Sequence, residues 1–241
     1  MTPLSFTALS VAAAMEPTWP AAKTERLGPW LLRDGQGGGK RVSATSLEGD
    51  FDRASLTAVE AAMRHRGSPA LFSLGPNDAV LDAALAERGY RLVDPVVIYA
   101  ASLTDLPQDP APLMTTFPHW PPLGIAVDLW AEGGIDAARV AVMNRVAGPK
   151  CVILGRQNDR AAGVAFVAVH ASFAFLHALE VPPLMRRKGV ARNILQAAAG
   201  WANEQGASAL ALAVTAANDG ARALYASFGM QVVGQYHYRQ L

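Results

Sequence analysis

The sequence is poor in cysteine, in net charge and in long apolar runs. Cys151 is the single cysteine among 241 residues, which excludes an intrachain disulfide and a metal site built on cysteine. Lys and Arg total 21 while Asp and Glu total 20, so the formal net charge is +1. Such a small net charge gives no general attraction to nucleic acid or to an anionic membrane. Any anion-binding role must therefore come from a local cluster of basic residues.

No segment approaches the about 18 uninterrupted apolar residues of a membrane-spanning helix. Residues 4–15 are apolar, but no Lys or Arg precedes Lys23, so the positive region that begins a secretory signal is missing. We therefore expect a soluble, cytoplasmic protein that binds neither membrane nor nucleic acid. The histidines show no metal-ligand spacing, and we expect no metal. Cys151 precedes an apolar run and is expected to be buried.

Apolar residues are abundant, at 51% of the chain, which is ample material for a core. The length suits one large domain or two modest ones. Six prolines lie between Leu106 and Pro122, and this density excludes a helix interior or a central strand and favours an extended linker. The sequence is therefore predicted to divide into residues 1–105, a linker at 106–122, and residues 123–241.

The first half is predicted to mix strands and helices. Strands at 30–33 and 41–44 are expected to form a hairpin around a glycine-rich turn at 34–39. This turn is not a phosphate loop, because neither Lys-Ser/Thr nor a helix follows its glycines. Pro95 is expected to mark a bulge or an edge position. The remaining predicted elements are helices at 51–66 and 81–88 and strands at 70–74 and 91–100.

The second half alternates helix and strand, so the fold class is α/β or α+β with a mixed central sheet flanked by helices. The predicted elements are helices at 135–146, 190–205 and 220–228 and strands at 151–156, 163–169, 173–181, 209–215 and 231–236.

A tight basic turn lies between the strand at 173–181 and the helix at 190–205. The first amides of a helix have no intrahelical acceptor and lie at the positive end of its dipole, so they bind phosphate well. Small residues at Gly189 and Ala191 allow the backbone to approach such a ligand closely. Positive charge comes from Arg186, Arg187, Lys188 and Arg192. The turn predicts a phosphate-binding site.

Two motifs in this half resemble the GNAT superfamily of N-acetyltransferases. The stretch from Val181 to Ala191 matches the fixed positions of that family's acetyl-CoA motif, V-x-P-x-x-[RQ]-x-x-G-x-[GA]. A second motif, N-x-x-A-x-x-[LF]-Y-x-x-x-G-[FM], is matched from Asn218 to Met230. The resemblance covers residues 123–241. The first half resembles the degenerate N-terminal repeat of two-domain members, and with no phosphate turn it is expected to bind no CoA, to complete the sheet and to wall the substrate pocket.

The resemblance implies direct transfer of an acetyl group from acetyl-CoA to an amine of a small-molecule acceptor. It implies that backbone amides from Arg187 to Arg192 grip the pyrophosphate and that an amide near Val181 polarises the thioester carbonyl. The residues it assigns to the cofactor are Leu179, Val181, Arg186, Arg187, Lys188, Gly189, Val190, Ala191, Arg192, Asn218, Ala221 and Tyr225. The acceptor's identity stays open, and so does a homodimer.

The resemblance also implies an acid and a base. Tyr225 is the candidate acid that protonates the leaving thiolate, with simple packing as the alternative. Glu180 is the first candidate for the base that takes the amine proton, and His177 is the second, with a satisfied core position favoured for His177. Because their separation is odd, Glu180 and His177 are expected on opposite faces of the sheet. Trp130, His237 and Tyr238 are weaker candidates for lining the acceptor pocket, since such residues more often pack.

Two other functions fit the same sequence less well. A non-catalytic module that binds or senses acyl-CoA would keep the fold but would not need Tyr225. Nucleic-acid binding would rest on the basic turn alone, without a basic stripe.

Overall fold

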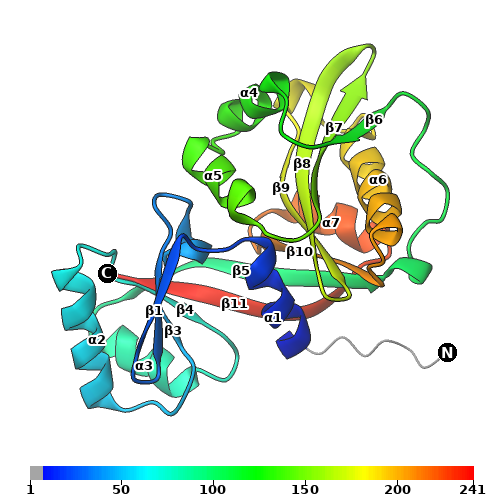
Figure 1. The fold of residues 1–241 in the computed structure, drawn as a ribbon. Helices are drawn as coiled ribbons and strands as arrows, with labels where there is room; N and C mark the ends of the chain where they lie inside the picture. The colour runs from blue at the N-terminus through cyan, green and yellow to red at the C-terminus, as the bar shows by residue number, and fades with distance from the viewer. Residues whose placement is uncertain (1–7) are drawn as a thin grey trace.

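One continuous sheet of eight strands crosses both halves of the chain in the computed structural model, which describes residues 8–241 (Figure 1). Residues 4–7 of the apolar N-terminal segment lie outside the described residues. The strand order is β4-β11-β5-β10-β9-β8-β7-β6, and only the β10–β9 pair is parallel. The strands are β4 (Leu71–Leu74), β5 (Arg91–Ser102), β6 (Thr116–His119), β7 (Lys150–Gln157), β8 (Arg160–His170), β9 (Phe173–Glu180), β10 (Ala209–Thr215) and β11 (Gln231–Gln240).

A second, antiparallel sheet of three short strands lies in the first half of the described chain. A single parallel bridge between Thr45 and Phe72 joins it to β4. Its strands are β1 (Lys23–Leu27), β2 (Trp30–Asp34) and β3 (Ser46–Leu47). The predicted hairpin around the glycine-rich turn is wrong, because β2 pairs with β1 and β3 while Lys40–Val42 forms a 3₁₀ turn. The strand β1 escaped prediction because all five of its residues are exposed and none signals a core face.

Helices cover both faces of the large sheet. Apolar side chains of α6 pack on β7 and β8, while α1, α4 and α5 cover the opposite face. In the first half, α2 and α3 enclose a separate core around Trp30 and Phe72. The helices are α1 (Ala8–Thr18), α2 (Arg53–His65), α3 (Ala79–Glu87), α4 (Gly124–Glu132), α5 (Ala137–Arg145), α6 (Val190–Glu204) and α7 (Asp219–Ser227). The sequence predicted five of them and missed α1 and α4, whose segments are apolar without a clear helical stripe.

The two halves exchange their last strands. In Figure 1 the long strands β5 and β11 run side by side, and β5 lies between β10 and β11 in the sheet. The units β4–α3–β5 and β10–α7–β11 share one strand–helix–strand plan, with a glycine at positive φ after each helix, Gly89 and Gly229. The first half thus completes the sheet of the second. The predicted boundary at 106–122 divides the sequence, while the sheet continues across it.

The Pro-rich segment is extended, as predicted, and contains the four-residue edge strand β6. Pro118 lies opposite Ile153 at the outer edge, where a missing N–H costs no ladder bond. Pro95 follows the positive φ of Asp94, and the β5–β11 register shifts beside it, which confirms the predicted bulge. Cys151 is buried, as predicted, and burial raises the pKa of its thiol to about 12.

The carboxylate of Asp82 ties α3 to the exchanged strand β11. It accepts hydrogen bonds from Arg239 Nε at 2.7 Å and Nη2 at 3.0 Å, and from His237 Nε2 at 2.8 Å. The bonds from Arg239, together with His237, lower the pKa of Asp82 from 3.8 to about 2. This pair therefore stabilises the fold while the carboxylate is ionised.

We expect Asp82→Asn to lower the free energy of unfolding at neutral pH by about 2 kcal/mol, from the size of the pKa shift. Because the folded-state pKa is depressed, this contribution is present above the unfolded value of 3.8 and is lost as pH falls through about 2. Urea unfolding of both proteins across this range measures it. The matched control is Asp219→Asn, whose exposed ion pair with Arg222 should contribute under about 0.5 kcal/mol. A difference for Asp82→Asn that stays constant with pH would contradict this account.

Candidate active site

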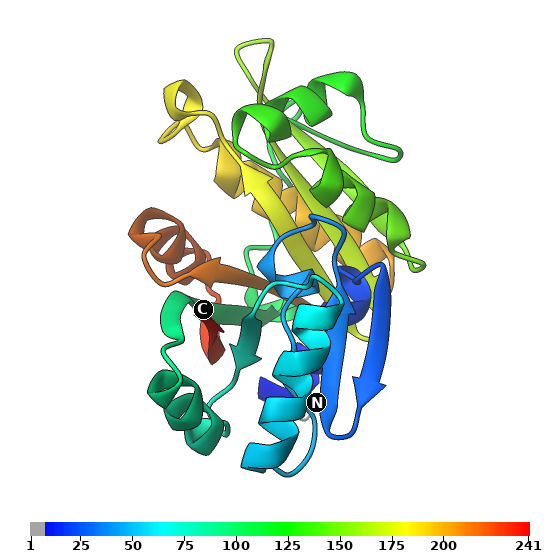
Figure 2. The same ribbon diagram turned by 90° about the vertical axis from the view of Figure 1, so that its left-hand side faces the viewer.

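The parallel strands β9 and β10 pair only from Phe173 to Leu176 and from Ala209 to Leu212. Beyond these residues the strands part, and a cavity of about 420 Å³ opens between them. Its walls include Leu179 from β9, Thr215 from β10, and Asn218 and Tyr225 at α7. The turn after β9 and helix α7 both lie toward the left-hand edge of the molecule in Figure 2. Three of the predicted cofactor residues, Leu179, Asn218 and Tyr225, therefore line one opening.

A β-bulge bends the end of β9 at this opening. His177 pairs with Phe166 and Glu180 with Val164, so one extra residue stands on β9, and Ala178 has a φ of 51°. The indole N–H of Trp130 donates to the carbonyl of Ala178 at 2.8 Å and satisfies it. Trp130 is fully buried in the core under α4 and holds the bulge, so it does not line the cavity.

The bulge overturns the expected orientation of His177 and Glu180. Cross-strand partners lie on the same face, and Val164 and Phe166 are two residues apart, so their partners His177 and Glu180 share a face as well. The prediction from their odd separation in the sequence was wrong, because the extra residue of the bulge reverses the alternation of side chains between the two faces of β9. Both side chains lie on the face covered by α1 and α4, with His177 against Trp19 and Glu180 against Gly133.

The turn from Val181 to Gly189 leads into α6 with its amides directed outward. Gly189 precedes the helix at a φ of 82°, and Arg187 has a φ of 62°. The first helical bond runs from the Asn193 N–H to the Gly189 carbonyl, so residues 190–192 lie where a helix has no intrahelical acceptor. Arg186 Nε donates to the Val181 carbonyl at 2.9 Å and closes the turn. The side chains of Arg187, Lys188 and Arg192 are exposed beside these amides, an arrangement that fits a phosphate.

Two glycines let the start of α6 approach the sheet. A side chain at Gly163 would meet Val190 at 2.9 Å and the Glu180 carbonyl at 3.0 Å, and one at Gly155 would meet Ile194 at 2.9 Å. These approaches are closer than ordinary van der Waals contact. The position of the turn over the sheet therefore depends on Gly155 and Gly163, which the sequence did not single out.

Tyr225 places its phenol at the cavity from α7. The residue is only 5% exposed and packs beside Tyr99. Among the residues that the structure describes, none hydrogen-bonds to the Tyr225 hydroxyl, which nevertheless is not one of the fully enclosed polar atoms. Burial, and secondarily Tyr99, raises the pKa of Tyr225 to about 12. The hydroxyl is thus protonated at neutral pH and available to a ligand.

Asn218 caps α7. Its side-chain oxygen accepts from the Ala221 N–H at 3.1 Å, and Asn218 also lines the cavity. Ala221 packs against the core under α6. The second motif therefore has a structural role in beginning the helix that carries Tyr225.

His177 is a satisfied core residue, as favoured from the sequence. It is 5% exposed, and its Nδ1 lies 3.2 Å from Arg41 Nη1 while its Nε2 lies 3.0 Å from Thr18 Oγ1. Because Arg41 has only donors, Nδ1 must accept and Nε2 carries the proton. Burial, and then the charge of Arg41, lowers the pKa of His177 well below 6.5. The imidazole is neutral and has no position left for an amine proton.

Glu180 lies beside the cavity rather than among its lining residues. Its carboxylate is 19% exposed and lies 3.6 Å from the guanidinium of Arg186. Glu180 at the end of β9 and Tyr225 on α7 therefore lie on different sides of the same opening.

The first half of the chain closes the cavity. Gly38 and Gly39 come from the glycine-rich turn and Arg41 from the 3₁₀ turn that follows it, while β11 of the second half adds Tyr236 and Tyr238. The glycines allow this turn to lie against α5, since a side chain at Gly38 would meet Val142 at 2.5 Å. Tyr238 lines the cavity as suggested from the sequence, whereas His237 points to Asp82. No sequence pattern marked Arg41 or Tyr236, because contacts between residues distant in the sequence hold them here.

In the part of the chain that the structure describes, no cluster of His, Cys, Asp and Glu could hold a metal ion. In the same residues, no helix is both long and apolar enough to cross a membrane.

Comparisons with known proteins agree on one family. A sequence profile of the acetyltransferase (GNAT) family matches residues 111–230. The uncharacterized N-acetyltransferase YobR of Bacillus subtilis (strain 168) is 26% identical over 92% of this chain and 94% of its own. A GCN5-related N-acetyltransferase from Kribbella flavida has a similar structure, with a TM-score of 0.73 and 17% identity over 100% of this chain and 96% of that one. A tandem GNAT protein from the clavulanic acid biosynthesis pathway gives a TM-score of 0.59 and 16% identity, over 94% and 86% of the two chains.

We expect Gly163→Val to lower the free energy of unfolding by about 1–3 kcal/mol, because the new side chain would displace Val190 and the Glu180 backbone. The matched control is Gly200→Ala, because Gly200 lies inside α6 with open space around it. This substitution should stabilise the protein by about 0.5–1 kcal/mol. Urea unfolding of the three proteins measures both. A neutral Gly163→Val would show that α6 does not depend on this close approach.

Proposed function

The chain belongs to the GNAT superfamily of N-acetyltransferases, and from that premise we propose that it moves the acetyl group of acetyl-CoA directly to an amine of a small-molecule acceptor. The observation that carries the proposal is the opening between β9 and β10, which places unbonded helix amides at one end and the free Tyr225 hydroxyl beside it. Acetyl-CoA would supply the activated acetyl thioester.

The residues at the turn fit the cofactor. Backbone amides from Arg187 to Arg192 would hold the pyrophosphate, helped by the exposed charges of Arg187, Lys188 and Arg192. No atom lies within 4 Å of the place where a side chain at Gly189 would stand, so the ligand has room to approach the backbone. Leu179, Val181, Asn218 and Ala221 would border the rest of the cofactor.

The first half lacks an equivalent turn. Its helix α2 follows β3 as α6 follows β9, but the Asp52 carboxylate already accepts from the Ser55 N–H at 2.8 Å at the start of α2. A carboxylate at this end occupies the amides and repels a phosphate. In α3, Leu85 holds the place that Tyr225 has in α7. These differences support a single cofactor site, in the second half.

Three groups of this chain would carry the reaction, and His177 would act only by positioning its neighbours. A backbone amide near Val181 would polarise the thioester carbonyl. Glu180 would take the amine proton through a water, since it flanks the cavity without lining it. The Tyr225 hydroxyl would donate its proton to the departing sulfur. His177 would position Arg41 and Thr18 and take no proton.

We expect wild-type protein to bind acetyl-CoA and Gly189→Trp to lose that binding, because an indole would cover the amides at the start of α6. Titration calorimetry with acetyl-CoA measures both. The control is Gly206→Trp, which places the same side chain at a similar positive φ, also with open space around it, at the far end of α6. Equal losses in both variants would indicate strain instead of a blocked site, and no binding to wild type would overturn the proposal.

We expect Tyr225→Phe to lower kcat about 100-fold or more without changing acetyl-CoA affinity, because only the proton donor is removed. Since burial raises the Tyr225 pKa to about 12, the hydroxyl stays protonated below that value, and the ratio of wild-type to mutant rates should be constant from pH 7 to 10. Steady-state rates of CoA release measure it. An unchanged kcat would leave Tyr225 as a packing residue, and acetyl-CoA binding without any turnover would favour a non-catalytic acyl-CoA-binding module.

A further inference from the structure

The wall that the first half gives to the cavity carries positive charge. Lys40, Arg41 and Arg139 line the cavity, against the single carboxylate of Asp94 among its described lining residues. Lys40 pairs with Asp94 at 2.7 Å. Arg139 donates to the Gly134 carbonyl. The lining therefore keeps an excess of positive charge, even though the whole chain is nearly neutral.

Arg41 has only uncharged partners. Its guanidinium bonds the neutral imidazole of His177 and the Tyr236 hydroxyl, at 3.2 Å and 3.3 Å, and interacts with the Tyr238 hydroxyl. No carboxylate among the described residues lies within ion-pair distance of it, and residues 1–7 contain no Asp or Glu. Arg41 is half-buried, and a cation partly withdrawn from water is stabilised by a negative partner.

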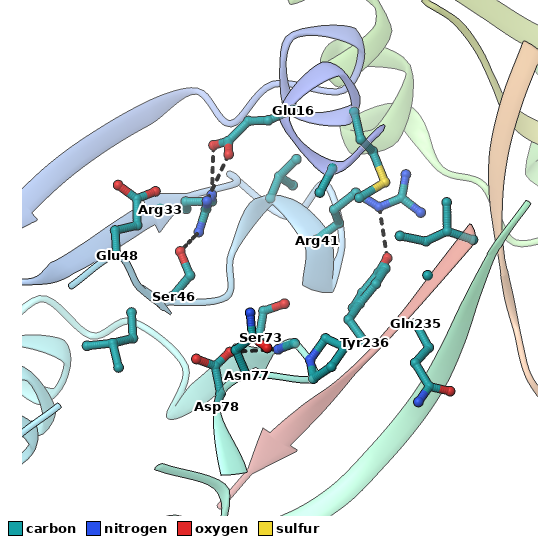
Figure 3. Close-up of a pocket in the computed structure, with 18 of the residues that line it drawn as sticks. Glu16, Arg33, Arg41, Ser46, Glu48, Ser73, Asn77, Asp78, Gln235 and Tyr236 are labelled. Carbon is teal, nitrogen blue, oxygen red and sulfur yellow. Dashed lines mark hydrogen bonds and ion pairs between the residues drawn. The ribbon is translucent and has the colours of Figure 1, made fainter. Parts of the chain in front are cut away.

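Nearby Arg33 shows the ordinary arrangement. It forms two bonds of 2.8 Å to the Glu16 carboxylate and further bonds to the Ala44 carbonyl and the Ser46 hydroxyl. Figure 3 shows both arginines, Arg33 joined to Glu16 and Arg41 joined only to Tyr236 among the residues drawn. Unlike Arg33, Arg41 therefore has no carboxylate partner among the described residues.

Arg41 also stands between two cavities. The second, of about 770 Å³, lies between α1 and the β3–β4 region, and Trp19, Arg41 and Tyr236 line both. A group held by Arg41 is therefore at the edge of the opening that contains Leu179 and Tyr225. The larger cavity has a size typical of small-molecule sites.

We propose that the acceptor is an amine that also carries a carboxylate, and that Arg41 determines this specificity by binding the carboxylate while the amine faces the opening. The proposal rests on the acetyltransferase function above and names its substrate class. The planar fork of a guanidinium matches a carboxylate with two parallel hydrogen bonds. The larger cavity gives room for the rest of the acceptor.

The same charges disfavour polycationic acceptors. The excess of positive charge belongs to the 420 Å³ cavity, since the 770 Å³ cavity is lined by Glu16, Glu48 and Asp78 beside Arg33 and Arg41. A polyamine would bring several ammonium groups to the smaller cavity, where repulsion between like charges weakens binding. An amine with a carboxylate brings one negative group to the unpaired cation. Amino acids and their derivatives therefore fit the lining better than polyamines.

The test uses matched pairs of acceptors that differ only in the anionic group. Amino acids with the amine and carboxylate at increasing separation, from glycine to 6-aminohexanoate, and the common L-amino acids are each compared with their carboxamides. For the amino acids that wild type acetylates fastest, we expect kcat/KM to exceed that of the matching carboxamide by about 10- to 100-fold. This factor is the usual contribution of a hydrogen bond to a charged group. In Arg41→Gln the ratio should fall to about one.

Two further variants keep the result interpretable. Arg41→Lys retains the charge without the fork and should keep part of the preference, so it serves if Arg41→Gln does not fold. Arg160→Gln, which removes an exposed cation from the β7–β8 turn, should leave the preference unchanged. Melting temperature and acetyl-CoA affinity are measured for every variant, and acetyl-CoA affinity should not depend on Arg41.

Two results would overturn the proposal. Wild type that acetylates amides or polyamines as well as the acids has no carboxylate specificity. A preference that is undiminished in folded Arg41→Gln, or in Arg41→Lys if Arg41→Gln does not fold, belongs to another residue. In both cases acetyl-CoA would still bind, so the failure would concern the acceptor alone. Absence of acetyl-CoA binding in wild type would instead remove the acetyltransferase proposal, and the acceptor proposal with it.

Discussion

The end of the parallel pairing between β9 and β10, at Leu176 and Leu212, is the constraint on which the rest of the site depends. While the strands pair, their backbone groups satisfy each other. Where they part, the strand edges face a cavity, and the backbone groups and helix starts around it are positioned by side-chain hydrogen bonds and by packing. Trp130 satisfies the Ala178 carbonyl at the bulge, Asn218 begins α7, and two glycines in β7 and β8 seat the start of α6. The opening is thus supported by residues that do not react.

The two halves are variations on one plan with opposite outcomes at their helix starts. Before α6, Gly189 leaves amides free, whereas before α2 the Asp52 carboxylate occupies them. The first half has instead supplied Arg41, a large cavity and a strand in the centre of the sheet. The first half therefore takes part in forming the cavity by providing part of its walls and its charge.

Apart from α4, local chemistry in the sequence predicted the helices and strands of the second half and the turn that precedes α6, because capping residues, glycines and apolar stripes act within a few positions. It also predicted the satisfied state of His177 and the bulge at Pro95. It could not predict features that arise from distant contacts. The extra residue at Ala178 reversed the alternation of β9, and the exposed strand β1 left no apolar signal. Arg41 is held at the cavity by contacts with His177 and Tyr236, which are distant in the sequence. Roles in catalysis for Glu180 and Tyr225 rest on resemblance and placement.

The exchange of β5 and β11 has a consequence for synthesis. The ribosome releases the first half long before the strand that lies between β4 and β5, which is the last strand of the chain. Until β11 is synthesised, the edges of β4 and β5 that it will cover have no hydrogen-bonding partner. Such unpaired edges can pair with the wrong strand or with another chain. Contacts this distant in sequence also slow folding. The pairing of β11 therefore joins β4 to β5 only after both of those strands have been made.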